Sequence, residues 1–326
     1  MKNFSLVIFS IIITAMILEL CLRLVGHGPF EYYKNNSPDP TIYKPDKKLG
    51  WTSKTASYHF KTNKENIIKY KFLKDGSRYT GYNLTQNSIK KKIVLIGGSF
   101  AMGHGVNDEE TFAYLLQKKL NRYQIKNFGI GGYGTYQSYL KLKDVFDTNK
   151  NIKIVVYSFI EDHEDRNVGD VSWHEFLTRL SGAAVYLPYA KLDKFGGLLD
   201  YPPEKYIVLP LSNFSVLITK IQKTIMKIIR FSLNKDRTLI TKKIITKMSR
   251  LSKKNNSNFI FVNLFANELK VNDYKKFAKE NHIPFSNCHI DIESNQEYVV
   301  DYHPNNLAHR KYFECTLNLI NEQKKS

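Results

Sequence analysis

Cysteine, glycine and proline are all scarce in this chain of 326 residues. The three cysteines, Cys21, Cys288 and Cys315, are too few for a disulfide scaffold and lack the paired short spacing of a zinc site. Cys288 and Cys315 can form one disulfide or remain two buried thiols, and the spacing leaves both open. With 17 Gly, 10 Pro and 42% hydrophobic residues, the sequence is neither collagen-like nor intrinsically disordered. We therefore expect a globular protein.

Acidic residues are also few, because 30 Asp and Glu face 49 Lys and Arg, for a net charge of +19. More than half of this excess lies in residues 219–254, which hold twelve Lys or Arg and one acid, Asp236. The basic residues repeat at helical spacing opposite isoleucines, which predicts two basic amphipathic helices. These form either a solvated face or a surface for anionic lipid or an acidic polymer. Nucleic acid is not expected, because no nucleic-acid-binding motif is visible.

An apolar segment opens the sequence. Residues 4–18 carry no charge and span roughly 22 Å as a helix, and continuing to residue 25 reaches the bilayer core thickness of about 30 Å. No small-residue cleavage site follows, and bulky Leu20 and charged Glu19 make Cys21 a poor lipoprotein site. Glu19 and Arg23 can pair on one helix face. We expect an uncleaved, single-pass membrane anchor over residues 1–26, and a cleaved signal peptide is the alternative.

The remaining chain divides into a connector and one larger domain. Residues 27–88 predict a connector with a β-hairpin at 67–82, around Asp75 and Gly76. Apolar runs at 93–96, 125–130, 152–160 and 259–265 predict buried strands, and amphipathic segments at 111–120 and 136–146 predict helices between them. This alternation indicates an α/β domain with a parallel sheet over 89–322. The stretch of about residues 168–257, between the third and fourth predicted strands, is too long for a crossover connection. It therefore predicts a helical insertion.

Ser99 is the first candidate for chemistry. It follows a predicted strand in the stretch Gly97-Gly98-Ser99-Phe100, where a strand-to-helix turn exposes the side chain of a nucleophile. A helix N-cap or a phosphate-binding loop is the alternative. The sequence has neither a Walker lysine nor the G-x-G-x-x-G spacing, which disfavours phosphate binding.

Three further polar blocks follow predicted strands or lead into the last helix. Residues 127–134 (NFGIGGYG) are glycine-rich and can aim backbone N–H groups at an anion. Residues 158–167 crowd acids around His163, as in a metal site or a plain polar loop. Near the C-terminus, Asp301 precedes His303 by two residues and can orient its imidazole. Pro304 suits the first position of the last helix, with His303 at the cap.

These four blocks, in this order, resemble the SGNH/GDSL hydrolases over roughly residues 90–165 and 258–320. The resemblance implies a flavodoxin-like three-layer sandwich with a central parallel sheet. It also implies Ser99 as nucleophile, His303 as general base and Asp301 as orienting carboxylate, without a metal or other cofactor. The backbone N–H groups of Ser99 and Gly132 become oxyanion donors.

Two residues depart from the family pattern. Gly98 replaces the Asp of G-D-S, and Glu161 stands where an Asn supplies a third oxyanion donor. Ionised Glu161 cannot donate a hydrogen bond, so we assign the third donor to His163, with Asn167 as the other choice.

The resemblance and the anchor together predict a membrane-anchored serine esterase or deacylase outside the cytoplasm, at the periplasm or cell surface. Its substrates are predicted to be O-acyl esters of a cell-surface glycan or lipid. An O-acyltransferase of the same fold is one alternative. A catalytically degenerate module that binds a surface polymer or a protein partner is the other, and Gly98 and Glu161 motivate it.

Overall fold

The computed structural model describes residues 2–33, 41–61, 67–82, 91–292, 295, 297, 299–300 and 302–325. The chain forms two compact units, each assembled from three segments. The first, here called the helical unit, comprises Met1–Asn36, Gly169–Leu187 and Glu204–Lys235. The second, the sheet unit, comprises Ser37–Val168, Pro188–Pro203 and Asp236–Ser326.

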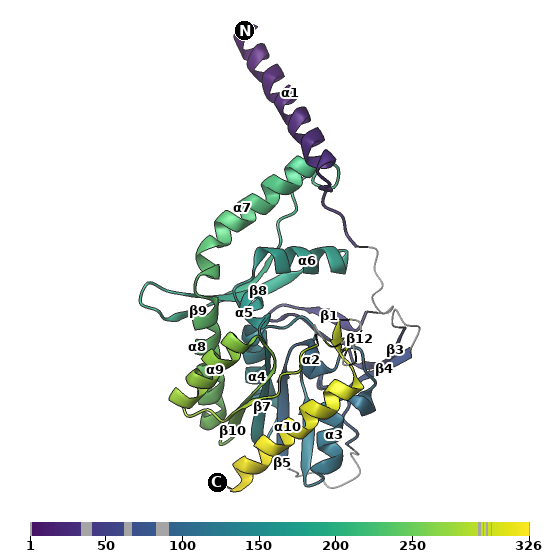
Figure 1. Ribbon diagram of the computed structural model, residues 1–326, viewed down its shortest axis with the longest axis vertical. Coiled ribbons are helices and arrows are strands. Elements are labelled where there is room, and N and C mark those ends of the chain that lie inside the picture. The colour runs from purple at the N-terminus through teal and green to yellow at the C-terminus, as the bar shows by residue number, and fades with distance from the viewer. Residues whose placement is uncertain are drawn as a thin grey trace. The chain divides into compact units, whose positions relative to one another are not determined.

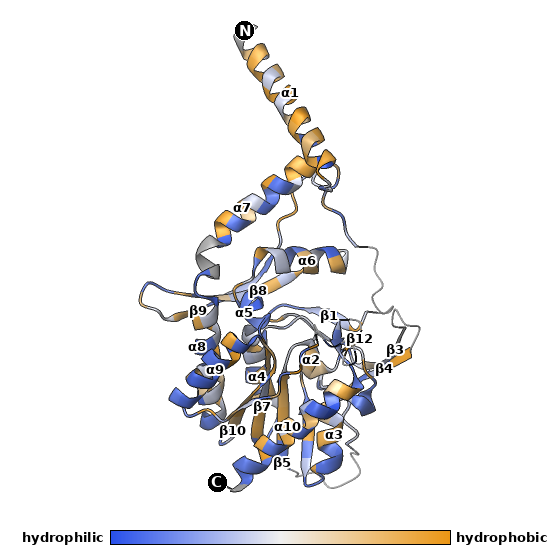
Figure 2. Cartoon of the chain, in the orientation of Figure 1, coloured by the Kyte–Doolittle hydropathy of each residue, from blue (hydrophilic) through white to orange (hydrophobic). Residues whose placement is uncertain are grey.

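A five-stranded parallel sheet forms the centre of the sheet unit (Figure 1). Its strands are β5 (Lys91–Gly97), β6 (Tyr123–Asn127), β7 (Ile152–Ile160), β10 (Asn258–Phe265) and β11 (Phe285–Asn287). They lie in the order β11-β10-β7-β5-β6, which is the 2-1-3-4-5 order of flavodoxin-like sheets. Their β-branched and aromatic residues are buried on both faces, and the strands are correspondingly apolar in Figure 2. The predicted α/β class with a central parallel sheet is confirmed.

Helices pack on both faces of this sheet. On one face lie α3 (Phe112–Lys119) and α10 (Asn306–Lys325), and on the other lie α4 (Thr135–Thr148), α8 (Arg237–Lys254) and α9 (Glu268–Glu280). The first face buries a cluster that includes Ile93, Leu95, Phe112, Leu116, Tyr312 and Ile320. Two short helices, α2 (Ser99–Met102) and α5 (His163–Asn167), follow β5 and β7 directly, and the 3-10 helix η1 (Asp108–Glu110) precedes α3.

Residues of α8 were predicted to belong to a helical insertion over about 168–257, but the helix is part of the sheet unit. Its residues Ile240, Ile244, Ile245 and Met248 are buried, and the helix contacts α4 and β10. It therefore serves as the covering helix that leads into β10. The basic composition of α8 hid this role, because its apolar face is narrow between many lysines.

Several short strand pairs surround the sheet. Strands β1 (Tyr43–Asp46) and β2 (Gly50–Ser53) pair antiparallel, as do β3 (Ala56–Lys61) and β4 (Ile67–Phe72). Residues 67–82 were predicted to form a hairpin of their own. Instead β4, its first strand, pairs with the preceding strand β3. After the turn at Gly76, only Arg78 forms a bridge to Phe72. Strands β8 (Tyr186–Leu192) and β9 (Leu198–Lys205) form another pair, and β12 (Val299–Val300) pairs antiparallel with β13 (His303–Pro304).

The helical unit contains α1 (Lys2–Leu24), α6 (Val171–Ser181) and α7 (Val216–Asn234). A small core of Phe30, Val171, Tyr206 and Met226 holds it together. Within α1, residues Phe4–Leu24 are long and apolar enough to cross a membrane, and their side chains are exposed. Figure 2 shows α1 as predominantly hydrophobic, in agreement with either an anchor or a signal sequence.

Candidate active site

Ser99 lies at the carboxyl end of β5, as the first residue of α2. The turn depends on Gly97, which has a φ of 156° and is closely packed against its neighbours. A Cβ atom at Gly97 would lie 2.6 Å from the carbonyl oxygen of Ser158 and 2.8 Å from Ala101 Cβ. The glycine therefore lets α2 begin directly against the neighbouring strand, which fixes the position of the serine.

His303 contacts Ser99 although 204 residues separate them. The Nε2 atom of His303 lies 3.0 Å from Ser99 Oγ, within hydrogen-bond distance. His303 stands in the short hairpin of β12 and β13, where Tyr302 adopts a positive φ of 59°. This hairpin corrects one expectation: Pro304 belongs to β13, and α10 begins at Asn306, because the Asn305 side chain accepts hydrogen bonds from the first turn of the helix.

The location of this pair follows from the sheet order. The connections from β5 to β6 and from β6 to β7 run on opposite faces, so the strand order reverses between β5 and β7 while all strands stay parallel. Open α/β sheets bind ligands at such a switch point, outside the carboxyl ends of the strands. Ser99 begins where β5 ends, and the hairpin that precedes α10 brings His303 to the same edge.

Two side chains, one from α2 and one from the loop after it, surround the imidazole of His303. The ring of Phe100 meets it edge-on at 5.7 Å, and the ring centroid of His104 lies 4.4 Å away. Burial, together with the neighbouring His303 and Arg78, lowers the pKa of His104 well below its usual value. His104 is therefore neutral at pH 7 and does not add a second positive charge beside a protonated His303.

Gly132 lies in the loop after β6. Phe128 N–H donates to the carbonyl oxygen of Leu95 and Ile130 N–H donates to that of Gly97, which fastens this loop along the end of β5. Gly132 has a φ of 81°, a conformation that favours glycine. Among the described residues, neither Gly132 N–H nor Ser99 N–H donates a hydrogen bond.

His163 is fully buried beside Gly98. Its Nδ1 atom lies 2.9 Å from the hydroxyl of Tyr157, which is also hydrogen-bonded to Thr135. The Nε2 atom of His163 has no hydrogen-bond partner among the described residues. Burial and the charge of Arg166 lower the pKa of His163 well below its usual value, so the ring is neutral. As an oxyanion donor, His163 would carry its proton at Nε2.

The other predicted residues of this block have structural partners. The Glu161 carboxylate accepts hydrogen bonds from the backbone and side-chain nitrogens of Asn267 at 2.9 Å, at the start of α9. The Asn167 side chain accepts from Tyr136 N–H and donates to Thr241, so its amide is occupied. Asp301 lies outside the described residues. Within the described ranges, no group of three or more His, Cys, Asp or Glu side chains could hold a metal ion.

No family model and no curated protein matches this chain. Solved structures similar to it include TesA, with 12% identity over 71% of this chain and 98% of that one, at a TM-score of 0.42. A member of the lipolytic G-D-S-L family from Veillonella parvula is similar, with 11% identity over 70% and 97% and a TM-score of 0.40. AlinE4, an SGNH-hydrolase family esterase, has 10% identity over 73% and 98% and a TM-score of 0.36. At such low values, function must be argued from the site itself.

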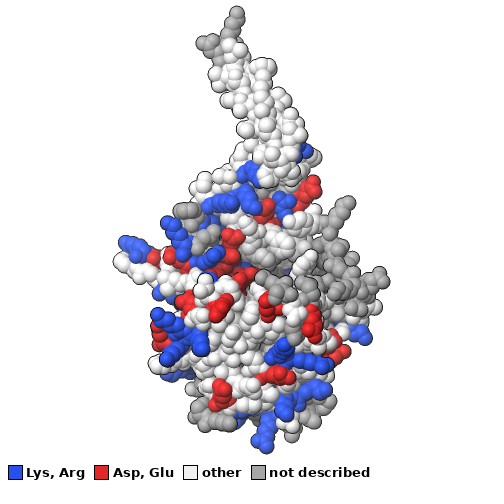
Figure 3. All heavy atoms as spheres, viewed as in Figure 1, with Lys and Arg blue, Asp and Glu red and all other residues white. Residues whose placement is uncertain are grey.

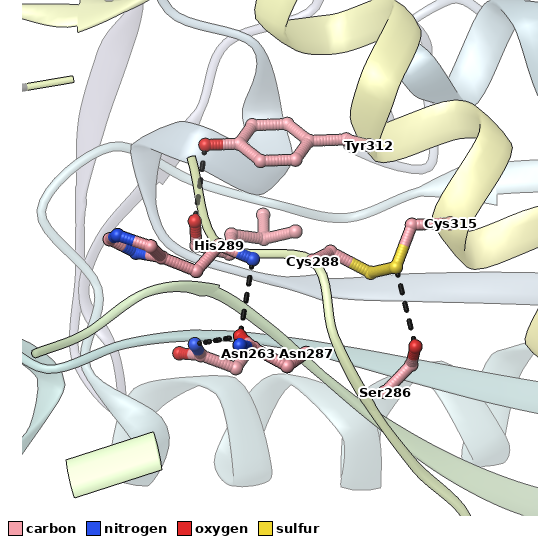
Figure 4. The surroundings of a disulfide bond; sticks show 8 residues. Asn263, Ser286, Asn287, Cys288, His289, Tyr312 and Cys315 are labelled. Atoms are coloured by element: carbon pink, nitrogen blue, oxygen red, sulfur yellow. Dashed lines mark hydrogen bonds between the residues drawn. A yellow bond between two sulfur atoms is a disulfide. The ribbon is translucent and has the colours of Figure 1, made fainter. Parts of the chain in front are cut away.

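A disulfide joins Cys288, just after β11, to Cys315 in α10 (Figure 4). The hydroxyl of Ser286 lies 3.3 Å from the sulfur of Cys315. Of the two alternatives that the spacing left open, the structure has the bridge. The segment that it closes contains His303, so the disulfide ties both ends of this segment to the sheet and to α10.

Arg78 supports the loop after Ser99, a role that no sequence pattern predicted. Its guanidinium is fully buried and donates to the carbonyl oxygens of Met102, Gly103 and Val106 and to the Asp108 carboxylate. It also stacks on Tyr70 at 4.4 Å. In the sequence Arg78 stands among alternating basic and aromatic residues, a pattern that predicts an exposed side chain. Only the fold shows that it holds four acceptors in place.

Proposed function

We propose that this protein is a membrane-anchored serine esterase or deacylase that acts outside the cytoplasm on O-acyl esters of a cell-surface glycan or lipid. The observation that carries the proposal is the 3.0 Å contact between Ser99 Oγ and His303 Nε2. A serine hydroxyl that meets an imidazole at the carboxyl edge of an open α/β sheet is the arrangement that activates an oxygen nucleophile.

The reaction proceeds in two steps. Ser99 Oγ attacks the acyl carbonyl carbon while His303 Nε2 takes the hydroxyl proton. The tetrahedral oxyanion receives hydrogen bonds from the N–H groups of Ser99 and Gly132, each worth about 3 kcal/mol in the transition state. His303 returns the proton to the departing alcohol oxygen, which leaves an acyl-serine. Water then attacks this ester with His303 as base, and the carboxylic acid is released.

Three further side chains have supporting roles in this proposal. Asp301 is proposed to orient His303 through Nδ1. His163 is proposed as the third oxyanion donor through Nε2, which has no hydrogen-bond partner among the described residues. Neutral His104 lines the imidazole and keeps water away from it.

The proposed location rests on two features. The apolar helix Phe4–Leu24 has the length of a membrane span, and its side chains are exposed. The disulfide between Cys288 and Cys315 indicates an oxidising compartment, because cytoplasmic thiols are kept reduced. Both features support a domain that is held at the outer side of a membrane.

Covalent labelling tests the nucleophile. The full chain in detergent is treated with a fluorescent fluorophosphonate, which modifies activated serines. We expect labelling of the wild type and none of Ser99→Ala, whereas His303→Ala slows labelling by about 10²- to 10⁴-fold, the usual contribution of a general base. Ser252→Ala is the matched control, since the hydroxyl of this buried serine in α8 has no hydrogen-bond partner among the described residues.

The outcomes separate the proposed enzymes from a binding module. Folded wild type that is not labelled would exclude the serine mechanism and favour a degenerate module. Labelling that persists in Ser99→Ala would place the nucleophile elsewhere. Once labelling is established, product analysis with an acylated glycan distinguishes the hydrolase, which releases free acid, from an acyltransferase, which forms a new ester.

A further inference from the structure

Helix α7 presents three different faces. One face is buried and includes Val216, Thr219, Gln222, Met226 and Arg230. A second carries lysines, of which Lys223 pairs with Glu175 at 3.0 Å. The third consists of isoleucines at helical spacing, and we call it the isoleucine stripe: Ile221, Ile225, Ile228 and Ile229.

The isoleucine stripe is exposed throughout its length. Ile228 is 71% exposed, Ile229 is 59% exposed, and the other two are exposed to 40% or more. At the start of the same helix, Phe214 is 75% exposed and Leu211 is 64% exposed. Single exposed isoleucines are ordinary on protein surfaces, but a continuous apolar row indicates an interaction surface.

Hydrogen bonds fasten the start of α7 to the end of α1. The Glu19 carboxylate accepts from Ser215 Oγ at 2.8 Å and from the first two backbone N–H groups of α7, those of Val216 and Leu217, at 3.0 and 2.8 Å. Arg23 donates to the carbonyl oxygen of Phe214 at 2.6 Å and to Glu19 at 2.7 Å. The two ends thus meet through four hydrogen bonds, with Arg23 and Glu19 also bonded to each other within α1, and α7 starts where the apolar helix finishes.

The direction of α7 relative to α1 also determines where α7 lies with respect to a membrane. Figure 1 shows α7 leaving the base of α1 across the axis of α1, so that it does not continue the apolar helix. A helix of 23 residues is about 35 Å long, enough to reach from one side of a bilayer core to the other. If α1 crosses the bilayer, the first turn of α7 lies at the membrane surface and the rest of α7 runs along it.

We infer that α7 lies in the lipid interface of the membrane that α1 spans. The isoleucine stripe enters the acyl-chain boundary, and Lys220 and Lys227 meet the lipid headgroups. Helices with an apolar face and flanking lysines bind membranes in this way. Glu19 and Arg23 set the angle between span and surface helix. The inference rests on the membrane anchoring proposed above and adds a second contact with the bilayer.

Quenching by lipids with brominated acyl chains tests this contact. The full chain, with Cys21→Ser and the Cys288–Cys315 disulfide intact, is reconstituted into vesicles of phosphatidylethanolamine and phosphatidylglycerol. A fluorophore is attached to one cysteine introduced as Ile225→Cys on the stripe or as Lys227→Cys on the basic face. Ile11→Cys in α1 reports on the anchor. All three side chains are exposed, so these replacements leave the cores intact.

We expect strong quenching at 11 and several-fold stronger quenching at 225 than at 227. Quenching at 11 without quenching at 225 would overturn the inference while the anchor stands. Equal quenching at 225 and 227 would overturn the assigned orientation of the stripe. Cross-linking between copies through 225, without quenching, would show that a second chain covers the stripe in place of lipid. Absence of quenching at 11 would refute the anchor itself, and the inference with it.

Discussion

Gly98 is the residue at which this chain departs from the G-D-S pattern, and its surroundings explain the departure. A Cβ atom there would lie 2.7 Å from His163 Nε2, 3.0 Å from the carbonyl oxygen of Tyr133 and 3.3 Å from Arg166 Nη1. The imidazole of His163 is held by Tyr157 and cannot easily move. A side chain at position 98 would therefore collide with these neighbours in the packing of this chain.

We predict that Gly98→Ala destabilises the sheet unit by about 1 to 3 kcal/mol, the usual cost of overpacking, and lowers kcat. The added methyl must displace His163 or the Tyr133 carbonyl, which follows the proposed donor Gly132. Urea unfolding and ester hydrolysis measure the two effects. Gly28→Ala is the control, since a Cβ atom there meets nothing within 4 Å. Wild-type stability and kcat in Gly98→Ala would contradict this account.

At this scale the sequence predicted which residues approach each other but not what supports them. Ser99 and His303 could be paired because the order of motifs resembles that of the SGNH/GDSL hydrolases. The neutral state of His104 and the burial of Arg78 depend on packing from β4 and from the hairpin of β12 and β13. Such contacts between distant segments leave no local pattern in the sequence.

At the scale of elements, the disulfide and α10 fix the segment that carries His303. Cys288 and Cys315 bracket this segment, and Cys288 lies in the same buried cluster as Ile260 and Tyr312. The short hairpin of β12 and β13 has only two residues in each strand, so it adds little rigidity of its own. The position of His303 thus depends on how firmly the two ends of the segment are held.

We predict that replacing both cysteines, Cys288→Ala with Cys315→Ala, lowers the free energy of unfolding by about 3 kcal/mol, because the cross-link restricts a segment of this length in the unfolded chain. We also expect a lower kcat, since His303 would sample positions away from Ser99. Cys21→Ala, at an exposed free cysteine, is the matched control. Ester hydrolysis and denaturant titration report the results, and an unchanged kcat in the double variant would show that the hairpin alone positions His303.

Most elements of the sheet unit could be predicted from hydrophobic pattern. The runs at 152–160 and 259–265 correspond to β7 and β10 almost residue for residue, because strands buried on both faces need continuous apolar sequence. Strand β11 was not predicted, since three residues, Phe285–Asn287, carry too little signal. Helix α8 was assigned to an insertion, because its many lysines obscured the four apolar residues that face the sheet.

At the scale of the whole molecule, lysines and arginines alternate with the acids that pair with them, and the net charge is +19. Lysines and arginines of α8 contact acids of the sheet unit, such as Lys242 with Asp273 at 2.6 Å. In the helical unit, buried Arg230 donates to the carbonyl oxygen of Gly169 at 2.7 Å. Figure 3 accordingly shows blue and red side chains interspersed over the face in view, whereas α1 is white along most of its length. The basic composition therefore does not form one continuous surface for a polyanion on this face.

Buried neutral histidines occur in both units. Burial lowers the pKa of His174 to about 4 and that of His309 to about 3. In the unfolded chain a histidine has a pKa of about 6.5, so the unfolded state binds more protons as the pH falls below that value. Stability is therefore complete above pH 6.5 and is lost as the pH falls from 6.5 toward 4. For each histidine the loss at pH 4 is about 3 kcal/mol.

His174 allows this loss to be measured in the helical unit alone. It lies beside Trp173, and with Trp51→Phe this tryptophan becomes the sole indole probe of the chain. The variant His174→Gln retains a donor for the carbonyl oxygen of Val185. We predict that its unfolding free energy falls less steeply between pH 6.5 and 4, with a slope smaller by the equivalent of about one bound proton. His27→Gln, at an exposed histidine of the same unit, should leave the slope unchanged. Parallel slopes for His174→Gln and the parent protein would mean that His174 takes up a proton in the folded state, and that its burial does not make this unit sensitive to acid.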